Sequence, residues 1–470
     1  MSGTLETMEL EALKTALADQ QLFEGKSWRL SPEAWRLTPA MVAAFEEIGQ
    51  ASLEFYKAFE ILYRRSFEGR KLLRNKELYA PWVAEYLDRG KPKALVELCR
   101  RKSNKGKLPP VIRPDLLVTE AGFALSELDS VPGGIGLTAY LNQLYERSGD
   151  GSILGAGGQM EELFYRSVAG QAEGAQTPVV VIAVSEEAAT YKPEMDWLAE
   201  RLQRRGYRVY SLWVEEIFPL GGAVYFDVSG SPEKIDVVYR FYELFDLPNI
   251  STAEYIVEAA ENGEVVLTPP VRPFLEEKMG MALFHHHLLG EFWKENISKK
   301  SLKVLNKLIP KSWIVDPTPL PPGAVLDGPL AQGKPLHDWM ELAEASQKER
   351  NLVLKISGFH ETAWGSRSVV IGNDVSREDW SEALREAVDM AETHPHIIQE
   401  FKKSVRLKHP LYGEDGEVYE AHGRLRLNPY FFVEGDQAKL AGALATYCPP
   451  DKKIIHGMED AAMLPCKVVE

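Results

Sequence analysis

The stretch from Val111 to Gly136, VIRPDLLVTEAGFALSELDSVPGGIG, constrains the fold of this chain more than any other segment. Two strand-like runs flank the loop Glu120–Gly122, whose glycine supplies the left-handed conformation that a three-residue hairpin loop needs. Side chains two apart on a strand share one face. The segment therefore predicts an antiparallel hairpin whose register follows from the loop, to within a one-residue bulge.

Four charged side chains share one face of this predicted hairpin. Asp115 is expected opposite Glu127, and Arg113 opposite Asp129, and opposed positions lie about 5 Å apart at Cβ. One guanidinium cannot neutralise three carboxylates that lie so close together, so a pKa rises or a cation sits among them. Oxygen ligands without Cys or His favour Mg²⁺ or Mn²⁺, which leaves Arg113 to contact a phosphate oxygen.

Two other interpretations of the charged hairpin stay open. It could be a solvated sheet face with a local ion pair, or a glycosidase pair, whose carboxylates face each other across a substrate at about 5–9 Å. The apolar residues Ala124 and Leu128 indicate that one face is buried, and the Gly-rich turn Pro132–Gly134 follows directly. These features, together with the tightness of the cluster, favour a metal.

The first part of the chain is predicted to be helical. Apolar residues recur at spacings of three and four through Met41–Tyr63 and Trp82–Leu98, so residues 1–108 form a helical N-terminal region. Residues 109–150 contain the metal-binding hairpin.

Residues 151–262 are predicted to form a small Rossmann-like layer. A continuous apolar run is typical of a buried parallel strand, and an amphipathic segment follows the first such run. The predicted elements are the strand Val179–Val184, the helix Lys192–Arg205 ended by Gly206, and the strands Tyr207–Val214 and Lys234–Tyr242. No G-x-G-x-x-G turn is present, so a dinucleotide site is not indicated.

Residues 263–470 make up the rest of the chain. Helices are predicted over Leu275–Leu289 and Ser301–Leu308, the Pro- and Gly-rich tract Pro317–Pro335 is a loop, and a mixed α/β segment begins at Asn351.

The net charge and the cysteine content of the chain argue against several classes of function. The formal net charge of −15 disfavours non-specific nucleic-acid binding. The three cysteines have no C-x-x-C spacing, which argues against a zinc site or a disulfide framework and fits a reducing cytosol. No basic stretch with an apolar run opens the chain, and no apolar run approaches the roughly 18 residues that span a bilayer. A cytoplasmic protein without a membrane partner is expected.

The motif R-x-D followed by E-x-D, formed by Arg113, Asp115, Glu127 and Asp129, resembles the metal and phosphate motif of glutathionylspermidine synthase, whose last position is usually Asn. Later segments resemble the same family in the same order. They are the predicted helix Leu275–Leu289, the strand and loop Leu352–Gly372 (LVLKISGFHETAWGSRSVVIG), Ile397–Phe401 (IIQEF), Arg424–Phe432 and the HGMEDA stretch at His456.

This resemblance, to the synthetase domain without the amidase domain, implies an α/β fold with α+β lobes. The fold would be a circularly permuted ATP-grasp, with the hairpin of residues 109–150 in its core, the Rossmann-like layer of residues 151–262 inserted, and residues 263–470 as its lobes. It implies metal ligation by Asp115, Glu127 and Asp129, and a catalytic and phosphate-contacting Arg113. The other implied ATP-binding residues are Lys278, Lys355, Gly365, Ser366, Arg367, Gln399 and Glu400.

An enzyme of this kind uses ATP and Mg²⁺ to join a carboxylate to an amine. The γ-phosphoryl group moves to the carboxylate, an acylphosphate forms, and the amine attacks it; the protein mainly positions and stabilises charge. The expected substrates are a small-molecule acid and amine, from among peptides, amino acids and polyamines. The alternatives are an ATP-grasp phosphotransferase, a non-catalytic nucleotide-binding protein, and a hydrolase that uses the carboxylates without ATP.

Three further features have simpler interpretations. His285–His287 are consecutive helix residues that do not share a face, so they do not predict a metal site. Gly155–Gly158 lacks the G-K-[ST] ending of a phosphate-binding loop and is predicted to be a flexible loop. Arg240 could bind an acidic substrate, but a structural ion pair is the favoured interpretation.

Overall fold

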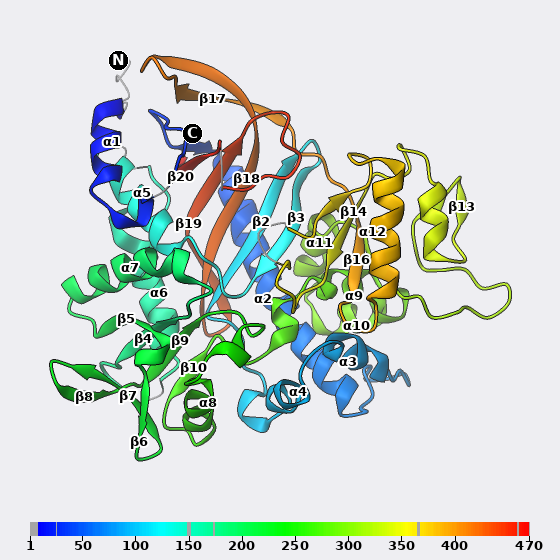
Figure 1. Ribbon diagram of the computed structural model, residues 1–470, viewed down its shortest axis with the longest axis horizontal. Coiled ribbons are helices and arrows are strands. Elements are labelled where there is room, and N and C mark those ends of the chain that lie inside the picture. The colour runs from blue at the N-terminus through cyan, green and yellow to red at the C-terminus, as the bar shows by residue number, and fades with distance from the viewer. Residues whose placement is uncertain are drawn as a thin grey trace.

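A computed structural model describes residues 8–24, 26–147, 152–172, 174–363, 367–457 and 460–469. These residues form an α/β fold with one seven-stranded sheet, two four-stranded sheets, and two smaller sheets of two and three strands (Figure 1).

The seven-stranded central sheet joins the two ends of the chain. Its order is β1-β20-β19-β18-β2-β3, with β17 paired to β18. The strands are β1 (Trp35–Leu37), β2 (Val111–Thr119), β3 (Gly122–Asp129), β17 (Arg406–Tyr412), β18 (Val418–Glu434), β19 (Gln437–Cys448) and β20 (Ala462–Val468). β1 runs parallel to β20, and the other pairs are antiparallel.

The periodicity predicted a helical N-terminal region. The region also contains the strand β1, which completes the central sheet. Its helices are α1 (Leu10–Ala18), α2 (Pro39–Phe67), α3 (Pro81–Asp88) and α4 (Lys93–Cys99). The Thr38 side chain accepts a hydrogen bond from the Met41 amide at 3.2 Å and so caps α2. The apolar stripe of α2, including Phe45 and Ile48, packs in one core with Leu425 and Phe431 of β18.

The amphipathic pattern over Trp82–Leu98 forms two short helices rather than one. The chain turns at Gly90, whose φ is +71° and whose missing Cβ leaves room for the Thr393 carbonyl, 1.7 Å from where a Cβ would lie. Only glycine accepts both the left-handed conformation and this approach.

The Rossmann-like layer is a four-stranded parallel sheet of order β10-β9-β4-β5. Its apolar strands, predicted from their continuous runs, are confirmed, and every residue of β4 is buried. The layer continues past residue 262, because β10 is its outer strand. Its elements are β4 (Val180–Val184), α7 (Lys192–Arg204), β5 (Val209–Trp213), β9 (Val237–Phe241), α8 (Ala253–Glu261) and β10 (Val266–Thr268); β6 (Phe218–Leu220), β7 (Ala223–Val228) and β8 (Ser231–Lys234) form the three-stranded sheet.

Two helices cover the other face of the central sheet. α5 (Ile135–Glu146) and α6 (Gln159–Ala169) bury side chains such as Phe164 in one core with Phe432 and with the apolar side of α7. The sheet is therefore covered by α2 on one face and by α5 and α6 on part of the other (Figure 1).

The second four-stranded sheet has the order β11-β16-β14-β15 and is antiparallel. Its elements are β11 (Ser312–Ile314), β14 (Leu352–Ile356), β15 (Val370–Ile371), α12 (Arg377–Asp389) and β16 (His396–Glu400); the hairpin of β12 (Leu330–Ala331) and β13 (Lys334–Pro335) lies beside it. Trp380 and Leu384 of α12 pack in one core with Leu352 and Leu354.

The helix predicted over Leu275–Leu289 is shorter and interrupted. A 3₁₀ turn at Pro273–Glu276 precedes α9 (Met279–His285), and a second turn follows at His287–Leu289. Two more helices complete this region, α10 (Gly290–Asn296) and α11 (Lys299–Leu308), the second as predicted apart from its start. Lys278 thus lies at the N-cap of α9 instead of within a long helix.

The three cysteines, Cys99, Cys448 and Cys466, are free and buried. Among the described residues, no helix combines the length and the apolar character needed to cross a membrane.

Candidate active site

The charged hairpin has the predicted register. Arg113 pairs with Asp129 and Asp115 pairs with Glu127 in the ladder of β2 and β3. The loop is one residue shorter than predicted, since Thr119 pairs with Gly122, but a bulge at Ser126 compensates for it. The register expected from the sequence is therefore confirmed, although a shorter loop and a bulge produce it together.

Asp115 is the buried centre of the cluster, and its side chain is 2% exposed. Its Oδ1 accepts hydrogen bonds from Arg113 Nε at 3.0 Å and Asn428 Nδ2 at 2.5 Å, and its Oδ2 faces Arg426 Nη1 at 3.0 Å. Arg426 and Asn428 lie on β18, more than 300 residues further along the chain, and the sequence analysis did not identify them. One carboxylate is thus held by two guanidinium groups and an amide.

Asp129 is less well compensated. Arg113 Nη2 lies 3.0 Å from its Oδ2, and the Val131 amide donates to its Oδ1 at 2.9 Å. Burial raises the pKa of Asp129 to about 6, although Arg113 lowers it, and the neighbouring Glu127 adds to the increase.

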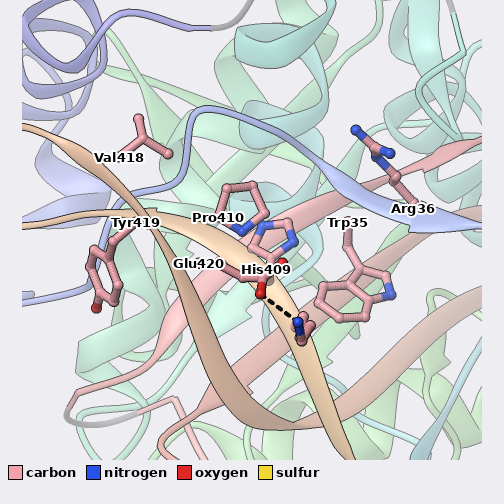
Figure 2. A pocket seen from close by; sticks show the side chains of 8 residues that line it. Trp35, Arg36, His409, Pro410, Val418, Tyr419 and Glu420 are labelled. Carbon is pink, nitrogen blue, oxygen red and sulfur yellow. Dashed lines mark ion pairs between the residues drawn. The ribbon is translucent and has the colours of Figure 1, made fainter.

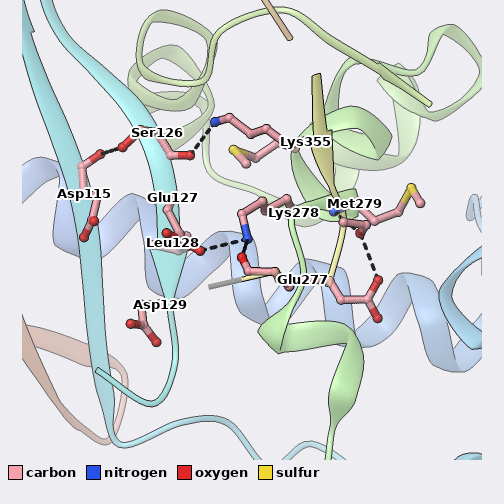
Figure 3. A network of polar contacts seen from close by, with 12 residues as sticks. Asp115, Ser126, Glu127, Leu128, Asp129, Glu277, Lys278, Met279 and Lys355 are labelled. Carbon is pink, nitrogen blue, oxygen red and sulfur yellow. Dashed lines mark hydrogen bonds and ion pairs between the residues drawn. The ribbon is translucent and has the colours of Figure 1, made fainter. Parts of the chain in front are cut away.

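Glu127 faces Lys278 across the gap between β3 and α9 (Figure 3). The Glu127 Oε1 lies 3.0 Å from Lys278 Nζ, which also donates to the Ala363 carbonyl at 2.8 Å. Burial alone would raise the pKa of Glu127, but the Lys278 ammonium lowers it below its usual value. With 39% of its side chain exposed, Glu127 is the most accessible of the three predicted metal ligands.

Lys355 approaches the same hairpin from β14. Its Nζ donates to the Ser126 carbonyl and to Gln399 Oε1, both at 2.9 Å (Figure 3). Burial, and then the nearby Lys278, lower the pKa of Lys355 to about 8. Two lysines that are 77 residues apart in sequence therefore meet at the bulged strand β3.

Gln399 and Glu400, predicted to lie beside adenine, differ in their surroundings. Gln399 is 2% exposed and its Nε2 donates to Ser312 Oγ at 3.0 Å, so its side chain supports Lys355. Glu400 is half-exposed and pairs with Lys402 at 2.7 Å. Gly365 and Ser366 lie outside the described residues, and Arg367 is exposed near the end of the same loop.

The turn after β3 is built around Gly134, which has a φ of +85° and opens α5. Arg113 Nη1 and Tyr430 Oη donate to the Gly133 carbonyl at 3.0 and 2.9 Å, while the Gly134 amide donates to Glu194 Oε1 at 2.6 Å. Burial raises the pKa of Glu194 to about 7 despite these amide donors. The turn thus fixes the direction of Arg113 toward the carboxylates.

One sequence signal could have identified the residues of β18. From Arg424 to Asn428 the polar residues alternate with Leu425 and Leu427, which is the pattern of a strand with one polar face. Three polar atoms on that face, Arg426 Nε, Asn428 Oδ1 and Thr446 Oγ1, are buried without a protein hydrogen-bond partner.

Arg240 forms the ion pair that was the favoured interpretation of this residue, and His285 and His287 contact different partners. Arg240 is fully buried, pairs with Glu276, and donates to the Pro269 carbonyl at 3.2 Å, so it is a structural ion pair. His285 contacts the Ile309 carbonyl at 3.0 Å, and His287 faces Asp327 at 3.0 Å. Within the described ranges, no three His, Cys, Asp or Glu side chains are arranged to hold a metal ion.

A separate pocket of about 460 Å³ lies where β1 approaches the β17–β18 hairpin (Figure 2). Its lining contains none of the predicted site residues; it consists of Trp35, Arg36, Lys408, His409, Pro410, Val418, Tyr419 and Glu420. The Lys408–Glu420 ion pair of 2.6 Å lies across it.

The described residues form an α/β protein in which carboxylates, guanidinium groups and lysines from separate sheets gather around the buried Asp115. No protein-family model matches the sequence, and no curated protein does. A solved glutathione synthetase-like effector from Globodera pallida, in its apo form, matches 98% of this chain and 96% of its own, with a TM-score of 0.58 and 11% identity. A predicted gamma-glutamylcysteine synthetase from Methylobacillus flagellatus matches 87% of this chain and 88% of its own, with a TM-score of 0.43 and 11% identity. The first likeness shows that this chain shares the overall fold of a glutathione synthetase-like protein.

Proposed function

We propose that this chain is an ATP- and Mg²⁺-dependent carboxylate–amine ligase with a circularly permuted ATP-grasp fold. The observation that carries the proposal is the meeting of Lys278 and Lys355 with the carboxylates of one hairpin, since they come from three separate segments. The synthetase-like fold of the Globodera pallida effector supports the same reaction class.

The two lysines would contact the phosphates of ATP. Lys278 is held between Glu127 and the Ala363 carbonyl, and Lys355 between the Ser126 carbonyl and Gln399, so both ammonium groups are oriented before ATP binds. Each charge-assisted hydrogen bond is worth about 1.5–3 kcal/mol, so removing one lysine would weaken ATP binding about ten- to a hundredfold.

Arg113 would stabilise the charge that develops on the transferred phosphoryl group and on the acylphosphate. Its side chain is fixed by Asp115, Asp129 and the Gly133 carbonyl, so it needs little reorganisation during the reaction. Arg426, whose Nε donor has no protein partner, lies beside the same carboxylate and would bind the acid substrate.

Of the three predicted metal ligands, Glu127 and Asp129 fit Mg²⁺ better than Asp115 does. Asp115 is 2% exposed and has a guanidinium group at each of its oxygens, so this residue would orient Arg113 and Arg426. Glu127 and Asp129 are more exposed, and their hard oxygens suit Mg²⁺, which usually binds one or two carboxylates together with substrate phosphates. The metal would neutralise phosphate charge when bound.

The alternative is an ATP-grasp phosphotransferase or a protein that binds nucleotide without turnover. One observation favours it: the four charged side chains of the predicted cluster, Arg113, Asp115, Glu127 and Asp129, all have protein partners, as in a site that is stable without substrate.

The test is the thermal stability of the wild type, Glu127→Ala and the matched control Glu420→Ala, an exposed carboxylate on β18. ATP at about a hundredfold excess over Kd should stabilise the wild type and the control by about 2.7 kcal/mol, with Mg²⁺ and not without it. Glu127→Ala should lose this metal-dependent gain. Release of ADP only when an acid and an amine are both present identifies a ligase; binding without that release identifies the alternative. No stabilisation of the wild type refutes both.

A further inference from the structure

The segment from Asp316 to Pro322, DPTPLPP, is restricted by its covalent chemistry alone. Every residue in it is either a proline or the residue before one. Proline fixes its own φ near −65°, and it excludes the helical region for the residue that precedes it. The residues before a proline, Asp316, Thr318, Leu320 and Pro321, are therefore limited to extended and polyproline II conformations, and each proline has the φ of a polyproline II helix. Accordingly, residues 315–321 form neither helix nor strand.

The protein anchors both ends of this segment. At its start, the Asp316 carbonyl accepts from Trp339 Nε1 at 2.9 Å, and the Asp316 carboxylate binds the Tyr86 hydroxyl and, at 2.6 Å, the Thr318 hydroxyl. Beyond its end, the Leu326 amide donates to the Leu336 carbonyl at 2.7 Å. The anchors hold the segment in place without covering it.

The prolines between these anchors face solvent. Pro317, Pro319, Pro321 and Pro322 are all exposed, and Leu320 is half-buried. In Figure 1 the yellow-green chain that leads to β13 bows away from the sheets. An anchored and solvent-exposed proline segment has little conformational entropy left to lose on binding.

The spacing of the prolines matches a known mode of recognition. A polyproline II helix has three residues per turn, so Pro319 and Pro322 lie on the same ridge. Thr318-Pro319 and Pro321-Pro322 form two X-Pro dipeptides around Leu320. Domains with aromatic-lined grooves bind such P-x-x-P segments because the polyproline II helix is preformed.

We propose that Asp316–Pro322 is a docking segment for a partner domain that recognises polyproline II helices through an aromatic-lined groove. The surface is formed by residues outside the candidate active site, so this interaction stands independently of the proposed ligase activity.

The test measures binding of the full-length protein to a panel of immobilised, purified SH3, WW and EVH1 domains. Three forms are compared: the wild type, the double variant Pro319→Ala/Pro322→Ala, and Pro335→Ala, which changes an exposed proline outside the segment. At least one domain should bind the wild type and Pro335→Ala saturably and the double variant at least about tenfold more weakly. Circular dichroism and melting of the double variant should match the wild type, since the prolines it changes are exposed.

A synthetic peptide of residues 314–324 should compete for the same domain, which locates the contact even if the double variant is perturbed. The proposal is overturned if no domain binds the wild type at concentrations up to about 1 mM. It is also overturned if the double variant binds as well as the wild type, or if the peptide does not compete.

Discussion

Replacing Arg426 by methionine would test the charge balance at the centre of the candidate site. Arg426 Nη1 is the partner of Asp115 Oδ2 at 3.0 Å, while Oδ1 keeps Arg113 and Asn428. Since the Asp115 side chain is 2% exposed, water cannot replace the lost partner. Removing one member of a buried ion pair costs about 3–5 kcal/mol. Because Arg113 still pairs with one oxygen of the Asp115 carboxylate, we expect the free energy of unfolding to fall by about 3 kcal/mol, the lower end of this range.

Urea unfolding followed by tryptophan fluorescence measures this change as a lower midpoint at an unchanged slope. The control is Lys408→Met, which breaks an ion pair of 2.6 Å between side chains that are each 60% exposed, and it should cost less than about 1 kcal/mol. The variant Asp115→Asn/Arg426→Met removes the uncompensated charge and should recover at least about 1 kcal/mol relative to Arg426→Met, as a double-mutant cycle reveals.

Either of two results would contradict the expected role of Arg426. If Arg426→Met is no more destabilising than Lys408→Met, then Arg426 does not compensate Asp115. If the double variant is as unstable as the sum of its two single variants, the loss comes from packing and not from charge.

Further predictions concern titration and reactivity. Lys355 is charged below its pKa of about 8 and neutral above it, so ATP affinity measured by calorimetry should fall about tenfold per pH unit above pH 8; an unchanged affinity in Lys355→Met would exclude its phosphate contact. His396 and His409 are buried with pKa values lowered by burial to about 4. The unfolded chain takes up their protons below about pH 6.5, so unfolding free energy should fall by about 2 kcal/mol per histidine between pH 7 and 5; His409→Gln should show a weaker dependence on pH, and an identical dependence would contradict this cause. Burial raises the pKa of Cys99 to about 12 and that of Cys466 above its usual range, so a thiol reagent should label the native protein at least roughly a hundredfold more slowly than the urea-unfolded protein. Rapid labelling of the native protein would show that these thiols are accessible.

Local patterns predicted much of the secondary structure. The apolar run Val179–Val184 was sufficient to predict the buried parallel strand β4, and Lys192–Arg205 predicted α7 to within one residue. The prediction of a helical N-terminal region missed β1, because β1 has only three residues and is a strand only through its pairing with β20. A strand so short has no periodicity of its own to read.

Alternation within Val111–Asp129 determined that Arg113, Asp115, Glu127 and Asp129 share a face, because strand periodicity is a local property of the backbone. The sequence could not show which groups compensate them. A single guanidinium against three carboxylates predicted a metal. In the folded protein Arg426 and Lys278 supply the missing positive charge from distant segments.

Local patterns in the chain therefore specified many of the helices and strands and the polar face of the hairpin. The distant side chains that complete the site, including Gln399 as a support for Lys355, follow from how the sheets pack together. The physical reason is that the backbone sets which way neighbouring side chains point, whereas ion pairing and burial depend on contacts between segments far apart in the chain.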